Sequence, residues 1–230
     1  MLKRILYFFL GLTGLFSLLC SIAANGVTNE TLMARGFVQH AQTASFGVYP
    51  SRYADYARAI TRYLDGKTDA ITVPNAETGA ETLAFSQREN LHMQDVRGIV
   101  TFLKWARWLG GGAVIAALAV LYILRRNQRE AFLRDAVRGF AFGAMALLGI
   151  AAALGVWGLI NFSGLFWTFH QTVFTNDLWL LNPQTDLLLA LMPLPFFTWY
   201  AGEILKSMLP ILAAMLLIII AYFKTKERKA

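Results

Sequence analysis

The stretch FLKWARWLGGGAVIAALAVLYIL, residues 102–124, decides the class of fold that this chain can adopt. Only Lys104 and Arg107 carry charge in it, and both lie near its start. About 20 mostly apolar residues in a helix are enough to cross the hydrocarbon core of a bilayer. The whole chain has 57% hydrophobic residues, which is typical of a membrane protein and excludes an ordinary soluble domain.

Three further segments resemble this stretch in length and composition. They are residues 5–24, 139–161 and 204–223. We therefore predict an all-α integral membrane protein with four transmembrane helices. The first segment also resembles a signal peptide, because it has a basic start and ends in small residues, but its long apolar run favours an uncleaved anchor that occupies residues 1–24.

The net charge of +7 is concentrated in short segments next to the predicted spans. Eleven of the 21 Lys and Arg residues lie before the first span, in the loop 125–138 and in the tail 224–230, together with only three acidic residues. Loops rich in Lys and Arg stay on the cytoplasmic side of a membrane. We predict that both termini and this loop are cytoplasmic, and that residues 25–101 and 162–203 lie outside. The charge thus reflects topology and not a nucleic-acid partner.

The first outer segment, residues 25–101, is polar enough to form a small extracytoplasmic cap that is mostly helical. Within it, the stretch 50–66 carries aromatic and aliphatic residues at helical spacing, and we interpret this stripe as packing. Residues 71–73 favour a short strand. The helical pattern resumes near Ser86 and continues into the span 102–124.

The second outer segment, residues 162–203, contains an apolar run that is too short to cross a bilayer. Pro193 and Pro195 interrupt it, so we expect an interfacial or re-entrant segment. An aromatic belt at headgroup depth would place aromatic residues in and beside this segment, as is found for Trp157, Trp167, Trp179, Trp199 and Tyr200. Asp186 lies beside this apolar run, where a carboxylate is costly, so a functional role and a solvated loop position are equally compatible with its place.

The three histidines, His40, His92 and His170, all fall in the predicted outer segments. His92 has Glu89 and Asp95 three residues to either side, so each carboxylate can share its helix face and orient the imidazole. His170 lies in the run FWTFHQTVF, where an imidazole needs a polar partner to offset its desolvation. His92 and His170 are therefore candidates for acid–base chemistry, although a surface role is equally compatible with their spacing.

Other chemistries have less support. Three histidines and a carboxylate are enough ligands for zinc, but no HExxH motif or other close ligand pair occurs, so we expect neither a metal nor a cofactor. The GxSxG motif of serine hydrolases is absent, the single cysteine Cys20 lies in an apolar span, and Gly110–Gly112 fits close helix packing. From the residues alone, a non-enzymatic accessory or sensor protein and a membrane hydrolase acting on lipids or peptides stay open.

Two motifs resemble one known family. ENLHMQDVRG at residues 89–98 and FHQTVFTNDLWLLNPQTDLLLALMPLPFF at residues 169–197, with four spans and a large first outer loop, resemble the Lit family of lipoprotein intramolecular transacylases. The resemblance covers nearly the whole chain. It implies that an acyl chain moves from the glycerol of a diacylglyceryl-cysteine lipoprotein to its N-terminal α-amine, giving the lyso-form lipoprotein. The implied partners are the lipidated N-terminal cysteine of bacterial lipoproteins and membrane lipids, at the outer leaflet of the bacterial cell membrane.

On this reaction, His92 is expected to act as general base, with Asp95 or Glu89 orienting it. His170 is expected to donate to the ester oxygen or to protonate the leaving alkoxide, or the two roles are exchanged. An imidazole of pKa about 6.5 is suited to remove a proton from an α-amine of pKa about 7.7–8.0. Four side chains in or beside the motifs are expected to bind or orient the substrate: Arg88, Glu89, Trp179 and Asp186.

Overall fold

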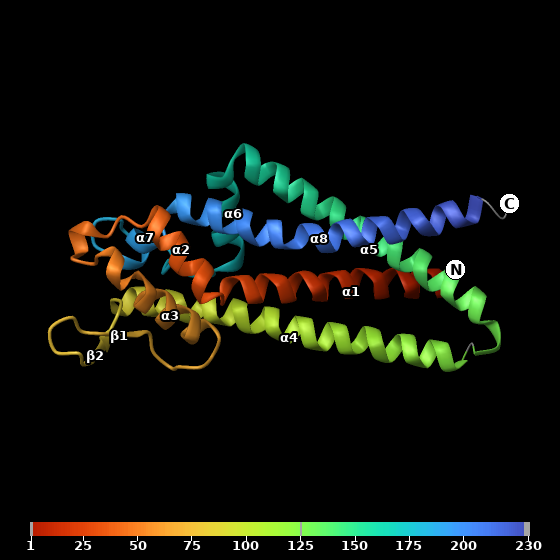
Figure 1. Cartoon of the computed structure of the whole chain (residues 1–230), viewed down its shortest axis with the longest axis horizontal. Helices are drawn as coiled ribbons and strands as arrows, with labels where there is room; N and C mark the ends of the chain where they lie inside the picture. The colour runs from red at the N-terminus through yellow and green to blue at the C-terminus, as the bar shows by residue number, and fades with distance from the viewer. Residues whose placement is uncertain (1, 125, 228–230) are drawn as a thin grey trace. The chain divides into compact units, whose positions relative to one another are not determined.

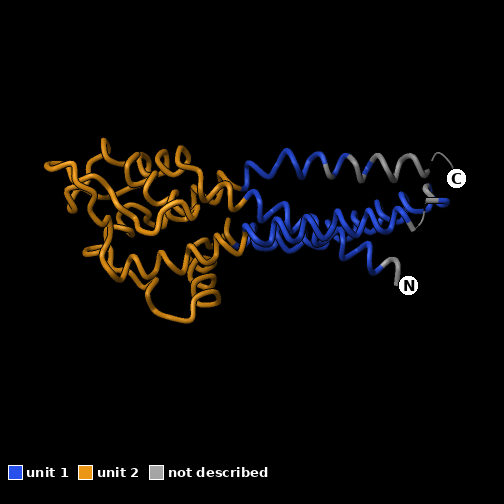
Figure 2. Tube along the Cα trace, turned by 90° about the horizontal axis from the view of Figure 1, so that it is seen from below, with its two compact units in different colours: residues 1–22, 104–157, 205–230 blue, residues 23–103, 158–204 orange. Residues whose placement is uncertain are grey.

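The computed structural model describes residues 2–124 and 126–227. Its α-helices are α1 (Leu2–Val27), α2 (Glu30–His40), α3 (Tyr53–Leu64), α4 (Gln87–Leu124), α5 (Arg129–Ile160), α6 (Phe162–Val173), α7 (Leu187–Leu191) and α8 (Leu194–Glu227), with strands β1 (Thr72–Pro74) and β2 (Glu81–Leu83) (Figure 1). The chain divides into two compact units (Figure 2). Unit 1 comprises residues 1–22, 104–157 and 205–230, and unit 2 comprises residues 23–103 and 158–204.

Three helical segments are long and apolar enough to cross a membrane. They are Ile5–Val27, Gln87–Ile123 and Glu130–Ile160. The apolar part of α4 begins only after Arg97, because four charged residues precede this point in the helix. The three segments correspond to three predicted spans, and α4 runs without a break into its span as expected. The fourth span, residues 204–223 within α8, stays a prediction.

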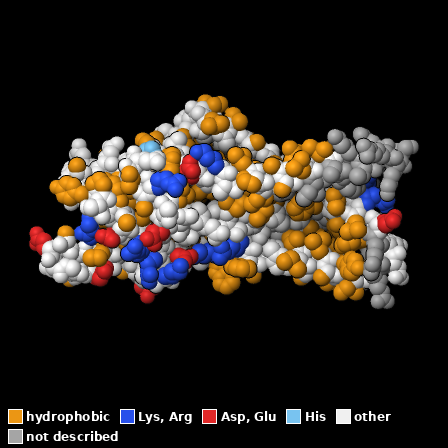
Figure 3. Space-filling model, viewed as in Figure 1, with side chains coloured by type: hydrophobic (Ala, Val, Ile, Leu, Met, Phe, Trp, Pro, Cys, Tyr) orange, Lys and Arg blue, Asp and Glu red, His pale blue; other side chains and the backbone are white. Residues whose placement is uncertain are grey.

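Unit 1 exposes apolar side chains as a lipid-facing surface does. On the face drawn in Figure 3, charged side chains gather over unit 2, while the described surface of unit 1 is largely hydrophobic. Among its side chains, Leu109 is 66% exposed and Ile115 is 71% exposed. Soluble monomers rarely expose large contiguous apolar patches, so this surface fits a bilayer as its solvent.

The closest approach of α5 to α1 in unit 1 depends on glycine. Gly139 and Gly143 form a GxxxG pattern on α5, and a Cβ atom at either position would collide with backbone atoms of α1 at Tyr7 or Phe8. Small residues allow helix backbones to approach closely in a membrane, where packing and not the hydrophobic effect drives helix association. The GxxxG pattern therefore fixes this helix pair.

Two features of unit 1 differ from the sequence analysis. Helix α5 begins at Arg129, well before the predicted span 139–161, so most of the predicted loop 125–138 is helical. The glycines expected to mediate packing were Gly110–Gly112. Gly110 does lie against Ser17, but the tighter backbone contact is the α1–α5 contact.

We expect Gly143→Leu to lower the thermal stability of the detergent-solubilised protein by several degrees, because its side chain has no space against α1. Overpacking of this kind costs about 1–3 kcal/mol in protein cores. The matched control is Gly149→Leu on the same helix, where a Cβ atom meets nothing within 4 Å. The melting temperatures of both variants test the contact, and an equal loss in both would contradict it.

Unit 2 has its own hydrophobic core, formed by α2, α3, α7 and the first turns of α8. Phe37, Ile60 and Leu191 are completely buried, and the Phe37 ring lies 5.5 Å from that of Phe196. The aromatic and aliphatic stripe of α3 lies entirely in this core, which confirms its interpretation as packing: Tyr53, Tyr56, Ile60, Tyr63 and Leu64.

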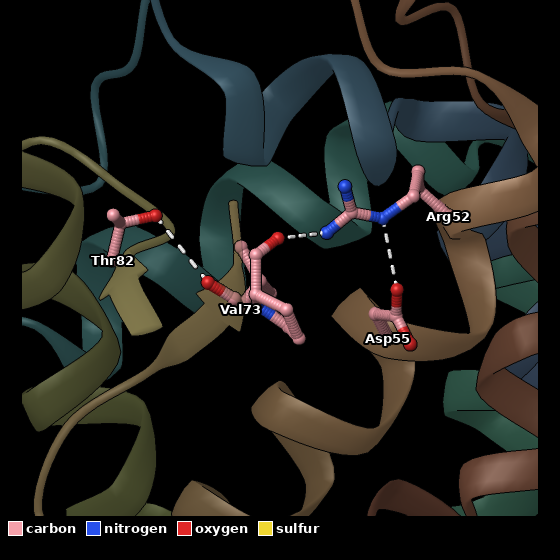
Figure 4. A network of polar contacts seen from close by, with 5 residues as sticks. Arg52, Asp55, Val73 and Thr82 are labelled. Atoms are coloured by element: carbon pink, nitrogen blue, oxygen red, sulfur yellow. Dashed lines mark hydrogen bonds and ion pairs between the residues drawn. The ribbon is translucent and has the colours of Figure 1, made fainter. Parts of the chain in front are cut away.

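A short antiparallel hairpin, β1–β2, follows α3 in unit 2. Arg52 donates from Nε to Asp55 at 2.9 Å and from Nη2 to the carbonyl of Pro74 in β1 (Figure 4). The Thr82 hydroxyl donates to the Val73 carbonyl at 3.3 Å, across the hairpin. Strand β1 was predicted. Strand β2 was not, because its three residues, ETL, show no clear alternation of apolar and polar side chains. The Arg52 contacts tie the hairpin to the start of α3.

The segment 162–203 is mostly helical. It contains α6, a loop at residues 174–186, α7 and the start of α8, in which Pro195 occupies the first turn, where proline is tolerated. Tyr200 is only 6% exposed and donates its hydroxyl to the Gly26 carbonyl at 2.8 Å. Tyr200 therefore packs within the protein, and its place in an aromatic belt at headgroup depth stays a prediction.

Candidate active site

His92, near the start of α4, and His170, near the end of α6, lie side by side in unit 2. Their ring centroids are 6.3 Å apart and their planes are inclined by 32°. Each side chain is only 8% exposed. Phe174 contacts both rings, with a centroid separation of 5.3 Å to each. Two of the three histidines in the chain thus meet in one buried site.

Side-chain caps set the start of each helix that carries a histidine. Ser86 precedes α4 and Glu89 lies three residues later; the Ser86 N–H donates to Glu89 Oε2 at 2.8 Å, which is a capping box. Asn161 precedes α6, and its Oδ1 accepts from the Gly164 N–H at 2.8 Å. These caps fix where each helix begins and hence which face carries its histidine.

Aromatic side chains surround the histidine pair. The His170 ring lies 4.2 Å from that of Phe166 and 5.1 Å from that of Trp179, which in turn contacts Trp167 at 4.9 Å. Trp179, predicted to bind substrate, is therefore at the site. Such a lining excludes water and offers apolar surface to an acyl chain.

The hydrogen bonds of the two rings differ. His170 Nδ1 lies 2.7 Å from the Phe166 carbonyl oxygen, which can only accept, so Nδ1 carries the proton and donates. In the neutral His170 ring, Nε2 then keeps the lone pair. His92 Nδ1 is buried and has no hydrogen-bond partner among the described residues. His170 is thus held in one tautomer with a basic Nε2.

Burial keeps both rings neutral. Desolvation, helped by the neighbouring His170, lowers the pKa of His92 to about 4, and the charge of Asp95 opposes this shift. Desolvation also lowers the pKa of His170, while its bond to the Phe166 carbonyl acts in the opposite direction. Near pH 7, the neutral form is therefore favoured at both histidines.

The two carboxylates next to His92 in sequence have other partners. Asp95 Oδ2 accepts from Asn176 Nδ2 at 2.9 Å, in the loop 174–186. Glu89 accepts two backbone N–H groups and is 2% exposed. No hydrogen bond joins either carboxylate to His92 within the described residues. Asp95 therefore acts on His92 through its charge, and the orienting roles expected of the two carboxylates do not take the form of a direct hydrogen bond.

Arg88 and Asp186 shape the loop between α6 and α7. Arg88 donates from Nη2 to the carbonyls of Asp177, at 2.7 Å, and Leu180, at 3.3 Å. Asp186 Oδ2 accepts from the Asn182 N–H at 2.6 Å, which closes a turn just before α7. Both side chains therefore bond to the loop, and no hydrogen bond among the described residues joins either of them to a histidine ring.

His40 has ring contacts that differ from those of the His92–His170 pair. It ends α2 and its ring contacts Trp199, with centroids 5.6 Å apart. Across residues 2–124 and 126–227, no three His, Cys, Asp or Glu side chains gather as a metal site requires. The structure thus brings together two of the three histidines and leaves the third outside the site.

Three contacts of the site were missed by sequence reasoning. Phe166 and Phe174 lie four residues before and after His170, so helical spacing held a signal that they share its surroundings. Asn176 gave no such signal, because its partner Asp95 is 81 positions away in the chain.

The fold resembles solved structures of the membrane-integral lipoprotein intramolecular transacylase Lit from Bacillus cereus. One of them matches with a TM-score of 0.70 at 22% sequence identity, covering 100% of this chain and 99% of that chain. Two variants of the same protein, in which a histidine is replaced by arginine or by alanine, match with TM-scores of 0.64 and 0.61 at 22% identity. They cover 99% and 100% of this chain, and 93% and 95% of their own chains.

No curated protein sequence matches the chain. The family model described as lipoprotein intramolecular transacylase Lit, however, matches residues 7–197. This range includes both histidines of the buried pair and most of the chain. The chain therefore belongs to the Lit family of lipoprotein intramolecular transacylases.

Proposed function

We propose that this protein is a membrane acyltransferase that moves an acyl chain within a lipoprotein, from the glycerol of the diacylglyceryl-cysteine to the N-terminal α-amine. The product is an N-acyl, S-monoacylglyceryl lipoprotein. Membership of the Lit family supports the reaction class. The observation that carries the proposal is the buried pair of His92 and His170, which can move a proton between two groups of one substrate.

The reaction needs one proton to move from nitrogen to oxygen. The amine nitrogen attacks the ester carbonyl carbon, and a base removes a proton from that nitrogen. The tetrahedral intermediate then collapses, the bond between carbonyl carbon and glycerol oxygen breaks, and the same proton passes to the glycerol oxygen. An amide and a hydroxyl group form without net uptake of protons, so one histidine can act first as base and then as acid.

His170 is better suited than His92 to carry this proton. Its Nδ1–H bond to Phe166 leaves Nε2 as the basic nitrogen. A general base works best when its pKa lies near the operating pH, and the pKa of His92, lowered to about 4, is far from it. We therefore assign His170 as base and then acid, which exchanges the roles that the sequence analysis put first.

In this assignment, His92 acts as a hydrogen-bond donor. Its Nδ1 is buried without a hydrogen-bond partner among the described residues, so we assign Nε2 as the nitrogen that donates to the oxygen of the tetrahedral intermediate. A neutral imidazole can polarise a carbonyl in this way, and its low pKa keeps it neutral. Asp95 lies nearby and stabilises any positive charge that the ring shares.

The intramolecular character of the reaction limits what the protein must supply. Donor ester and acceptor amine belong to one molecule, so holding them together removes much of the entropic barrier. Phe166, Phe174 and Trp179 provide the apolar wall for the acyl chains. We place this site at the outer leaflet and both termini in the cytoplasm, as the distribution of Lys and Arg predicts.

Mass spectrometry of a lipopeptide tests the proposed function. A defined lipoprotein is expressed with this protein in bacteria that lack other N-acylating enzymes, and its N-terminal lipopeptide is analysed. We expect wild type and the control His40→Gln to place an acyl group on the amine and to remove one from the glycerol. An unchanged diacylglyceryl lipopeptide, with the protein present in the membrane, would contradict the proposed function.

The pH dependence of kcat/KM should follow the substrate and not the enzyme. A histidine whose pKa is lowered stays neutral as the pH falls, and its base form is lost only below that lowered pKa. The α-amine, with a pKa of about 7.7–8.0, becomes protonated first. We expect log kcat/KM to rise with a slope of about one up to pH ~7.5 and to level off above pH ~8. A second ionisation centred near pH 6.5, measured with the same substrate, would contradict neutral buried histidines.

A further inference from the structure

Glu89 carries the most buried carboxylate of the site region, with 2% exposure, and both of its oxygens accept backbone hydrogen bonds. Oε2 accepts from the Ser86 N–H at 2.8 Å, at the start of α4. Oε1 accepts from the Leu188 N–H at 2.7 Å, at the start of α7. One side chain therefore binds backbone N–H groups at the starts of two helices, although Leu188 lies 99 positions after Glu89 in the chain.

The first N–H groups of a helix have no partner within that helix. The residue that precedes α7, Asp186, makes no side-chain hydrogen bond to the α7 backbone. Glu89 is thus the side chain that satisfies the start of α7. Because a helix start also has a positive electrostatic potential, a carboxylate between two such starts is well placed without a cationic partner.

This contact also fixes one wall of the active site. The loop 174–186 joins α6 to α7 and carries Phe174 and Trp179, which contact the histidine rings. Its far end is fixed where Leu188 bonds to Glu89. Glu89 lies three residues before His92, on a neighbouring position of the same helix face. The end of the loop 174–186 is therefore held by the same turn of α4 that carries His92.

We propose that Glu89 is a positioning residue for acyl transfer, which holds the start of α7 against α4 and thereby sets the position of the loop wall relative to His92. The effect of this role on catalysis depends on the proposed function. It requires a carboxylate, since only an ionised carboxylate offers two acceptor oxygens and no donor. A glutamine satisfies one N–H group and turns its own NH₂ toward the other.

Hydrogen exchange and steady-state kinetics together test this role in the purified full-length protein. For Glu89→Gln we expect faster exchange of the amides of residues 187–191 and a kcat about 100-fold below wild type, the loss that a misplacement of about 1 Å can cause. KM should change little, and the pH profile should keep its shape, because no titrating group of the reaction is removed. The matched control is Glu77→Gln, an exposed carboxylate in the β1–β2 turn, which should match wild type in all measurements.

Glu89→Asp gives a second reading if the glutamine variant does not fold. Aspartate keeps two acceptor oxygens but is one methylene shorter, so it should show an intermediate loss of kcat and intermediate exchange at residues 187–191. A kcat within threefold of wild type for a folded Glu89→Gln would overturn the proposal, and so would a loss of kcat with unchanged exchange at residues 187–191. If wild type itself transfers no acyl chain, the proposed function fails, while the exchange comparison still reports whether Glu89 holds α7.

Discussion

The variant His170→Gln is expected to transfer acyl chains about 10²–10⁴-fold more slowly than wild type, the range that general acid–base catalysis contributes. Glutamine is similar in size and can keep a hydrogen bond to the Phe166 carbonyl, so the fold should tolerate it. It cannot accept and return a proton at neutral pH. The rate of N-acylation under single-turnover conditions measures the loss, at matched protein amount and melting temperature.

The control for this variant is His40→Gln, which changes the same residue type outside the pair. His170→Ala should be as slow as His170→Gln, because both lack the basic nitrogen. If His170→Gln retained most of the activity while His170→Ala lost it, hydrogen bonding and not proton transfer would be the role of His170. That result would indicate that His92 is the general base.

The second large effect is expected for His92→Ala, with a loss of about 10²–10³-fold, the usual cost of removing one donor to an oxyanion. His92→Gln should be less impaired than His92→Ala, because its NH₂ group can still donate. This ordering distinguishes a donor from a base, since a base would lose equal activity in both variants. Rates of acyl transfer for the two variants at pH 8 provide the comparison.

Combining the two changes provides a further check on the second prediction. Residues that act as a unit in catalysis show strongly non-additive losses. We expect His92→Ala with His170→Gln to be little slower than His170→Gln alone, since both side chains act on the same tetrahedral intermediate. Fully multiplicative losses would instead indicate two histidines that act in separate steps.

Much of the fold follows from the length of the apolar segments, whereas its details depend on tertiary contacts. Residues 5–24 and 102–124 satisfy the length of a bilayer span, and their helices were predicted from that alone. The start of α8 was not predicted, because Pro193 and Pro195 look like interruptions. Pro195 instead lies in the first turn of α8, where its missing N–H group has no partner to lose.

The histidine pair could be predicted from motif resemblance, but the contacts that hold it could not. Glu89 and Asp95 were placed beside His92 because helical spacing puts them there. Apart from the local bond of Glu89 to Ser86, their hydrogen bonds run to Leu188 and Asn176, far along the chain. Local periodicity carries no information about such partners. The same limit explains why α7, only five residues long, was not predicted as a separate helix within the interfacial or re-entrant segment.

The neutral state of the two buried rings determines which inhibitors fit the site. A phosphonate that imitates the tetrahedral intermediate brings a negative charge, yet neither His92 nor His170 offers a fixed positive charge at neutral pH. Its binding must therefore raise the pKa of a ring and take up a proton, so its affinity should increase as the pH falls. An uncharged ketone of the same shape needs no proton and should bind equally at pH 6 and pH 8, which makes it the better starting point for inhibitor design.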